Sequence, residues 1–349
     1  MHIPEHLKKL RTHLFYYLLP CILLVAFLLW FFILLLMPAG NGQRVYGLTV
    51  NKGAALSLVA TELEQRKIIR SALHLRILAQ FKGQDRSIQA GDYRMTDLMT
   101  PAEILEKMVL GDTDARRFTL PEGYSIFQAA ELLEKAEIFK KDDFLAACQD
   151  DVLLKSLAIP GSSVEGYLFP GTYLVGFKAD EQTLISDMVQ TLKRKSKSLM
   201  TTIENSGFNL HQVLTLASIV EREAVAVDEM PLISSVFHNR LKAGMPLQSD
   251  PTAIYGVRIF GGTVTRKDVR RETPYNTYRI KGLPPGPIGN PGLDAIHAVL
   301  NPAETEYFYF VSRKDGTHQF SQTLKEHNQG VQRFLRTKKT RKTPAHHEK

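Results

Sequence analysis

The sequence predicts an α+β protein in which one apolar N-terminal helix precedes a body of short strands and amphipathic helices. Three observations carry this prediction. An uncharged apolar run spans residues 14–37, and a strand–turn–helix pattern occurs twice between 49 and 139. Helical segments from about 180 to 244 are then followed by a Gly- and Pro-rich stretch and a hairpin. With 349 residues, the chain is long enough for two modest domains.

The apolar run "LFYYLLPCILLVAFLLWFFILLLM", residues 14–37, predicts a single transmembrane helix. About 20 apolar residues cross the hydrocarbon core, whereas the apolar part of a cleavable signal peptide has roughly 7–15 and ends at a small-x-small site. This run is longer, and "MPAGNG" after it is a poor cleavage site, so we expect a retained anchor. Lys8, Lys9 and Arg11 precede the run, which predicts a cytoplasmic N-terminus (1–13) and an exported remainder.

Charge and cysteine content exclude some classes of partner. The formal net charge is +8, and part of it lies in the basic run 336–349, for which we expect a disordered tail. The sequence has no aromatic-interleaved basic ribbon, zinc-ligand spacing or Gly-rich phosphate loop, so a nucleic acid partner is disfavoured. Cys21 falls inside the apolar run and Cys148 is alone in the exported part, so we expect no disulfide within the chain.

A repeat predicts the first exported subdomain. Residues 49–69 and 119–139 align without gaps, with matches that include Gly53 with Gly123 and Ile68 with Ile138. Each copy predicts a short strand, a Gly turn and a helix. The pattern resembles a LysM module, a small fold that binds glycans containing N-acetylglucosamine, and we assign residues 44–155 to it. Coincidental recurrence of a βα pattern is the alternative.

Between the two copies, "IQAGDYRM" predicts a strand and "TPAEILEKMVLG" predicts a helix. Thr100 is its expected N-cap, Pro101 stands in the first turn and Gly111 ends it.

Residues 156–335 predict a second, mixed α+β domain. Its start, "LAIPGSSVEGYLFPGTYLVG", is rich in Gly, Pro and aromatic residues and has no helical period. Helices are expected from about 180 to 200, from an N-cap at Asn209, and from 229 to a stop at Gly244. Residues 245–301 show little periodicity, and such long irregular segments are more often functional than filler. "YFYFVS" and "GTHQFSQT" then predict a hairpin across "RKDG".

The helix that contains "LASIVEREA", residues 216–224, holds the main candidate for acid–base chemistry. At about 100° per residue, Glu221 shares a face with Ala217 and Ser218, whereas Glu223 lies nearly opposite. The two carboxyl groups therefore cannot cooperate as a pair. Burial among small neighbours would raise the pKa of Glu221, as a general acid requires. The alternative is a surface glutamate paired with Arg222 or with a lysine elsewhere.

The irregular segment supplies side chains suited to a carbohydrate site. Amides, hydroxyls and aromatic faces bind sugar hydroxyls, N-acetyl groups and ring faces. The candidates for substrate binding are Gln248, Asp250, Tyr255, Tyr275, Asn276 and Tyr278. A rigid loop with ordinary turn chemistry is the alternative, and both interpretations can hold together.

Five segments resemble the YceG-like (MltG) family of membrane-anchored endolytic murein transglycosylases. They are "EGYLFPGTY", "LASIVEREA", "NRLKAGMPLQSDPTAIYG", "YNTYRIKGLPPGPIGNPG" and "VSRKDGTHQF", in family order between about 44 and 335. By motif, the family's catalytic glutamate falls on Glu221, and Gln248, Asp250, Tyr275, Asn276 and Tyr278 fall in its substrate cleft. The family pattern has Asp where this chain has Gly171, which puts a carboxylate role there in doubt.

The resemblance implies a lyase that cleaves the β-1,4 bond between N-acetylmuramic acid and N-acetylglucosamine in nascent peptidoglycan. One glutamic acid protonates the glycosidic oxygen, and its carboxylate then takes the proton of the muramoyl C6 hydroxyl to close a 1,6-anhydro ring. No metal or organic cofactor is implied. The expected location is the cell inner membrane, with the catalytic domain in the periplasm and glycan polymerases, such as bifunctional penicillin-binding proteins, as partners.

Two other functions are compatible with parts of the sequence. A non-catalytic wall-binding anchor would use the LysM-like part, with Glu221 in a structural role. A pyridoxal-phosphate lyase is disfavoured by the exported placement and by the lack of a recognisable Schiff-base lysine motif.

Overall fold

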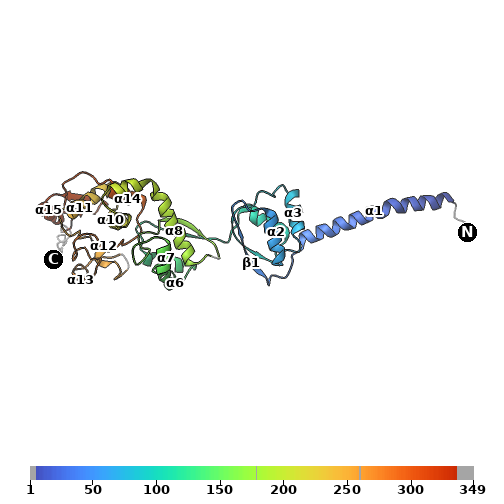
Figure 1. Cartoon of the computed structure of the whole chain (residues 1–349), viewed down its shortest axis with the longest axis horizontal. Coiled ribbons are helices and arrows are strands. Elements are labelled where there is room, and N and C mark those ends of the chain that lie inside the picture. The colour runs from blue at the N-terminus through green and yellow to red at the C-terminus, as the bar shows by residue number, and fades with distance from the viewer. Residues whose placement is uncertain (1–4, 178, 259–260, 336–349) are drawn as a thin grey trace, which may run out of the picture. The chain divides into compact units, whose positions relative to one another are not determined.

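The computed structural model describes residues 5–177, 179–258 and 261–335 (Figure 1). The predicted basic tail lies outside these residues. The chain forms two compact units: unit 1 contains residues 1–116 and 174–179, and unit 2 contains 117–173 and 180–349. We expected a boundary at 155/156, but the division falls at 116/117. The difference arises because α5 packs on α6 and α6 packs on α8, which attaches residues 117–155 to the second unit.

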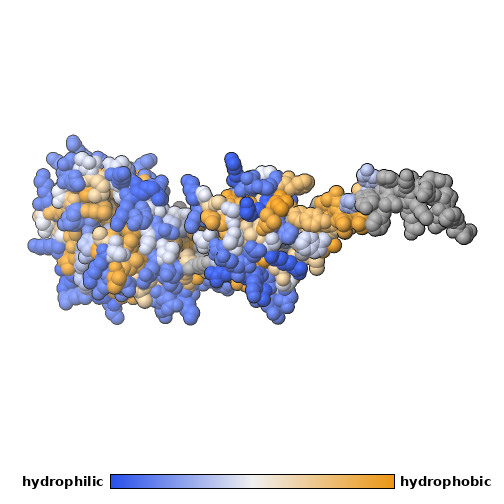
Figure 2. Space-filling view, turned by 45° about the vertical axis from the view of Figure 1, so that its right-hand side comes forward, coloured by the Kyte–Doolittle hydropathy of each residue, from blue (hydrophilic) through white to orange (hydrophobic). Residues whose placement is uncertain are grey.

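The N-terminal helix α1 runs without interruption from Glu5 to Leu36 and contains Pro20. Between Tyr17 and Ile33 it exposes many large apolar side chains, which form an apolar surface in Figure 2. Near its end it contacts α3, where the ring of Phe31 lies 5.0 Å from that of His74. Among the residues that the structure describes, no helix has both the length and the apolar content needed to cross a membrane.

Unit 1 continues as a β-α-α-β arrangement followed by one more helix. Its elements are β1 (Val45–Val50), α2 (Leu56–Gln65), α3 (Ala72–Phe81), β2 (Gly91–Thr96) and α4 (Pro101–Leu110). β1 and β2 are antiparallel, in a register that runs from Val45 opposite Thr96 to Val50 opposite Gly91. Alternate strand residues and the apolar faces of the three helices form one core, which includes Leu48, Leu63, Leu75, Tyr93 and Leu105.

Helix α4 begins and ends as the sequence predicts. Thr100 and Glu103 form a capping box, Pro101 stands in the first turn, and Gly111 closes the helix at φ 67°.

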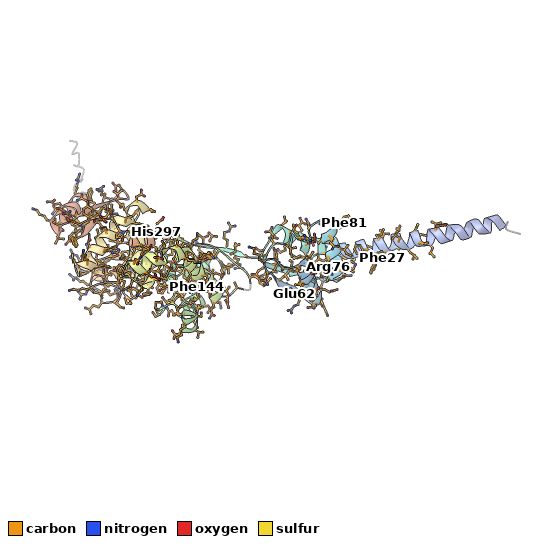
Figure 3. All side chains as sticks on the ribbon, turned by 45° about the horizontal axis from the view of Figure 1, so that its top comes forward. Phe27, Glu62, Arg76, Phe81, Phe144 and His297 are labelled. Atoms are coloured by element: carbon orange, nitrogen blue, oxygen red, sulfur yellow. The ribbon has the colours of Figure 1, made fainter. Side chains whose placement is uncertain are left out.

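Unit 2 is mainly helical. Its elements are β3 (Arg116–Leu120), α5 (Ile126–Lys135), α6 (Lys141–Ala147), α7 (Asp151–Ser156), β4 (Gly171–Val175), α8 (Glu181–Ser196), η1 (Lys197–Leu199), α9 (Met200–Asn205), α10 (Leu210–Glu223), η2 (Val227–Glu229), α11 (Met230–Lys242), α12 (Asp250–Ile254), α13 (Arg266–Arg270), α14 (Leu293–Leu300), β5 (Tyr309–Ser312), β6 (His318–Ser321) and α15 (Leu324–Leu335). Arg116, the first residue of β3, and the end of β4 from Leu174 belong to unit 1, and the rest of both strands belongs to unit 2. The two strands pair in a small sheet. The helices surround an apolar core in which Phe144, labelled in Figure 3, is fully buried. The predicted hairpin is present as antiparallel β5 and β6, with Tyr309 opposite Ser321.

The sequence repeat is also a repeat in structure. Both copies form a strand, a turn and a helix, and the turn glycines Gly53 and Gly123 have φ of 81° and 72°. After each helix the chain turns back in the same way, because Ile68 N–H donates to Leu63 (2.9 Å) and Ile138 N–H donates to Leu133 (3.0 Å). The copies lie in different units, however, so the second copy is not part of a single 44–155 subdomain.

Helix α14 lies inside the segment that we expected to be irregular. Its sequence, "LDAIHAVL", is apolar at most positions because α14 packs on both α10 and α11. Its polar residues Asp294 and His297 stand three positions apart and are exposed, so the helical period is present, but it lasts only eight residues after a Gly- and Pro-rich stretch.

Candidate active site

Helix α10 presents both glutamates in its last turn. It begins at a capping box formed by Asn209 and Gln212, and its central residues, 213–220, are all buried. It ends because Ala224 is extended, at φ −75° and ψ 137°. The buried body of the helix therefore fixes the position of Glu221 and Glu223, while its end lets loops from other parts of unit 2 approach them.

Glu221 lies against the start of α14 and the turn after β3. Its Oε2 accepts a hydrogen bond of 3.0 Å from the N–H of Gly292, which is the N-cap of α14. A Cβ built on Gly292 would lie 2.1 Å from Oε1 of Glu122, and one built on Gly123 would lie 3.2 Å from Cγ of Glu221. Because neither glycine has a side chain, Glu122 can lie against the main chain at Gly292 and Glu221 can lie against the main chain at Gly123.

The surroundings of Glu221 favour its protonated form. Burial raises the pKa of Glu221, and the neighbouring carboxylates Glu122 and Asp294 raise it further. The N–H of Gly292 and the charge of Arg222 act in the opposite direction, and the net result is a raised pKa. A half-buried carboxyl group that keeps its proton to higher pH is the state that a general acid requires.

The loop 286–292 is fixed to this place by Asn290, which is fully buried. Its main chain exchanges hydrogen bonds with Gly123 (2.7 Å) and Tyr124 (2.9 Å), and its side-chain oxygen accepts from the N–H of Leu168 (2.9 Å). The Ile288 N–H also donates to Oγ of Ser218, one turn before Glu221 on α10. The segment therefore has little freedom to move away from Glu221.

Glu165 is a buried carboxyl group below this loop, and the sequence analysis did not single it out. It is 2% exposed, and burial raises its pKa to about 8. Its carboxyl group accepts hydrogen bonds from the Ile126 N–H (3.1 Å), the Tyr255 hydroxyl (3.0 Å) and the Asn290 amide (3.2 Å). Glu165 thus joins α5, α12 and the loop beside Glu221.

Glu223 points to a different place, as the helix geometry predicted. Its Oε1 accepts a hydrogen bond of 2.6 Å from the hydroxyl of Ser249, just before α12. Burial raises the pKa of Glu223 to about 7. The two glutamates therefore contact different loops.

The predicted substrate-binding residues divide into three groups. Asp250 accepts a hydrogen bond of 2.7 Å from the Tyr278 hydroxyl, so both lie on the side of Glu223, next to the exposed Gln248. Tyr255 and Tyr275 contact each other with ring centroids 4.6 Å apart and ring planes inclined at 52°, and the hydroxyl of Tyr255 donates to Glu165.

Asn276 is fully buried and serves its own loop. Its amide donates to the main-chain oxygens of Asp268, Val269 and Arg271, and its side-chain oxygen accepts from the N–H of Tyr278. This placement makes Asn276 a support for Tyr278. Its predicted contact with substrate stays a prediction.

Glu122 and Ser249 are two further residues that the sequence analysis missed. Glu122 directly precedes Gly123, the turn glycine of the second repeat copy. This position next to a repeated turn is the sequence feature that could have identified Glu122. Among the described residues, no group of three His, Cys, Asp or Glu side chains is arranged to hold a metal ion.

Comparison with known proteins gives a consistent result. Residues 48–333 match the YceG-like family. The endolytic murein transglycosylase of Bacillus subtilis is 31% identical over 317 residues, which cover 85% of this chain and 87% of that protein. A protein of the same name from Streptococcus pneumoniae is 28% identical over 330 residues, but the match spans only 60% of its length. A crystal structure of a YceG-like protein from Listeria monocytogenes superposes with a TM-score of 0.59 at 31% identity, covering 82% of this chain and 99% of that one.

Proposed function

The chain belongs to the YceG-like family, and on that premise we propose that it is an endolytic lytic transglycosylase of peptidoglycan. It cleaves the β-1,4 bond between N-acetylmuramic acid and N-acetylglucosamine inside a glycan strand and leaves a 1,6-anhydro end. The observation that carries the proposal is the carboxyl group of Glu221. It is half-buried and held by the Gly292 N–H, and burial together with the neighbouring Glu122 and Asp294 raises its pKa.

The reaction needs one group that first gives and then takes a proton. Protonated Glu221 donates to the glycosidic oxygen as the bond breaks. The carboxylate that results then accepts the proton of the muramoyl C6 hydroxyl, whose oxygen closes the anhydro ring. The substrate's own hydroxyl replaces the water that a glycoside hydrolase activates with its second carboxylate. Mass spectrometry of uncrosslinked glycan strands after incubation with the protein tests the proposal, through the appearance of 1,6-anhydro ends.

We further propose that α1 holds the enzyme in the inner membrane, with the catalytic unit on the outer side. Two features support this: the uncharged sequence 14–37 and the apolar side chains that α1 exposes. A place in the membrane next to glycan polymerases would bring the enzyme to strands as they are made.

The full chain is expected to sediment with membranes and to stay there in 1 M salt, since burial of apolar side chains does not weaken with ionic strength. A chain that begins at residue 40 is expected to be released into the soluble fraction. Equal fractionation of the two chains would contradict the anchor.

Unit 1 is proposed to bind glycan as a LysM-like module. Its β-α-α-β order supports this, and so does a cavity of about 530 Å³. Residues 53–57, from the β1–α2 loop and the start of α2, line one side of the cavity. Residues of α3 and of the segment before β2 line the other, including Arg76 (labelled in Figure 3), Gln80, Asp85, Arg86 and Ile88.

Filling this cavity is expected to weaken glycan binding. In the full chain carrying Glu221→Gln, which prevents turnover, Ala55→Trp should lower the affinity for glycan strands by about tenfold, or about 1.4 kcal/mol. Leu58→Trp is the matched control, because Leu58 is exposed on α2 outside the cavity. Equal affinities of the two tryptophan variants in a sedimentation assay would exclude the cavity as the site.

A further inference from the structure

We propose that Glu223 is a positioning residue that holds the segment 247–250 and thereby orients Asp250 and Tyr278 toward the glycan. The inference rests on the proposed function, and it assigns to the second glutamate of α10 a task separate from proton transfer. Glu221 and Glu223 stand two positions apart, yet each fixes a different loop.

The segment 247–250 depends on Glu223 for its conformation. Ser249 donates its hydroxyl to Glu223 at 2.6 Å, and the main-chain N–H of Asp250 donates to the same carboxyl group. The preceding Gln248 has φ of 52°, a left-handed backbone conformation that is unfavourable for a residue other than glycine. On the other side the segment donates to Thr277: the Gln248 N–H donates to its main-chain oxygen, and the Ser249 N–H donates to its hydroxyl oxygen. A strained segment of this kind persists only while both sides hold it.

The groups that Glu223 positions are suited to a sugar. Asp250 is exposed at the start of α12, and one oxygen of its carboxylate is aligned by the hydroxyl of Tyr278. The other oxygen can accept a hydrogen bond from a sugar hydroxyl or from an N-acetyl N–H. The exposed side chain of Gln248 lies two residues away and offers both a donor and an acceptor.

Protonation of Glu223 keeps this arrangement intact. Burial and the neighbouring carboxylate of Asp250 raise the pKa of Glu223, while the Ser249 hydroxyl, His318 and the Asp250 N–H lower it, for a net value of about 7. Two charged groups also face it, Arg222 on α10 and Arg240 on α11, and the phenol of Tyr278, whose pKa is raised by burial, lies nearby. His318, on β6, is itself paired with Glu229 at 2.7 Å. Above about pH 7 Glu223 ionises in a buried place, and the cost of burying this charge favours arrangements in which the segment 247–250 moves away and water reaches the carboxylate.

The affinity for glycan should therefore fall with rising pH, and Glu223 should cause the fall. The background protein is the full chain with Glu221→Gln and Ala55→Trp, which stops turnover and limits binding by unit 1. Its dissociation constant for stem-free glycan strands is expected to increase about tenfold between pH 6 and pH 9. Adding Glu223→Gln, which cannot ionise but can still accept from Ser249, is expected to give tight binding at both pH values. The matched control is Glu204→Gln, an exposed glutamate on α9, and it should keep the full pH dependence.

A third variant, Glu223→Ala, separates positioning from simple charge removal. It lacks the acceptor for Ser249, so it is expected to bind weakly at both pH values while its thermal unfolding still shows a folded protein. Binding by Glu223→Ala as tight as that by Glu223→Gln would overturn the inference, and so would a pH dependence that persists in Glu223→Gln. Absence of 1,6-anhydro ends from the wild-type chain, with this binding pattern intact, would refute only the proposed reaction. No glycan binding by the background protein at either pH would overturn the inference, while 1,6-anhydro ends from the wild-type chain would still support the proposed reaction.

Discussion

Glu221→Gln is expected to reduce the formation of 1,6-anhydro ends by about 10³-fold or more, because it removes the one group that both gives and takes the proton. Glutamine can still accept from the N–H of Gly292, so the 286–292 loop should keep its place and the protein should remain folded. The measurement is the rate at which anhydro-ended fragments appear from uncrosslinked glycan, followed by mass spectrometry. Unchanged melting temperature and glycan binding would show that only the chemistry was lost.

Glu122→Gln is the informative companion variant. Glu122 raises the pKa of Glu221 through its negative charge. Its removal should leave the reaction in place but move the decline of activity at high pH toward lower pH, since Glu221 then loses its proton earlier. If anhydro ends persist in Glu221→Gln, or are lost completely in Glu122→Gln at every pH, then Glu221 is not the group that transfers the proton.

Glu165→Ala is expected to give the largest loss of stability, on the order of 3–5 kcal/mol, comparable to leaving several buried donors unsatisfied and opening a cavity. It leaves three buried donors without their acceptor: the Ile126 N–H, the Tyr255 hydroxyl and the Asn290 amide. It also creates a cavity below the loop that holds Glu221. Urea unfolding measures the loss, and activity should fall with it even at temperatures where the protein is folded.

Glu165→Gln distinguishes the hydrogen bonds from the proton. It keeps an acceptor for Tyr255 and Ile126, so its destabilisation should be clearly smaller than that of Glu165→Ala. The pKa of Glu165 is raised from 4.5 to about 8 in the folded protein. The unfolded chain therefore loses this proton first, and the wild-type protein should lose stability as pH rises from about 4.5 to 8. The glutamine variant should lose much less over that range. If the free energy of unfolding depends on pH equally in the wild-type protein and in Glu165→Gln, then Glu165 does not keep its proton on folding.

Local patterns in the sequence predicted most elements correctly. The capping residues of α4 and α10, the hairpin of β5 and β6, and both repeat copies are present as expected. These features depend on contacts between residues three to five apart or across one turn, which a single sequence displays directly. The opposite orientation of Glu221 and Glu223 also follows from helical periodicity alone.

Other features could not be predicted because they depend on distant partners. Helix α14 is only eight residues long and packs against both α10 and α11, and the unit boundary depends on which helices residues 117–155 contact. The division of the candidate residues, with Asp250 and Tyr278 beside Glu223 and Tyr255 above Glu165, requires loops that are up to 90 residues apart in sequence.

Motifs and local helix geometry are enough to identify the family, the helix that carries the two glutamates and the direction in which each glutamate points. The contacts of each carboxyl group depend on the folded chain. Glu221 accepts from the Gly292 N–H and lies against the turn at Gly123, Glu223 accepts from the Ser249 hydroxyl, and Glu165 lies buried between α5 and Tyr255. The physical reason is that a carboxyl group's protonation and its hydrogen bonds depend on burial and on neighbours from remote segments, and these exist only once the chain has folded.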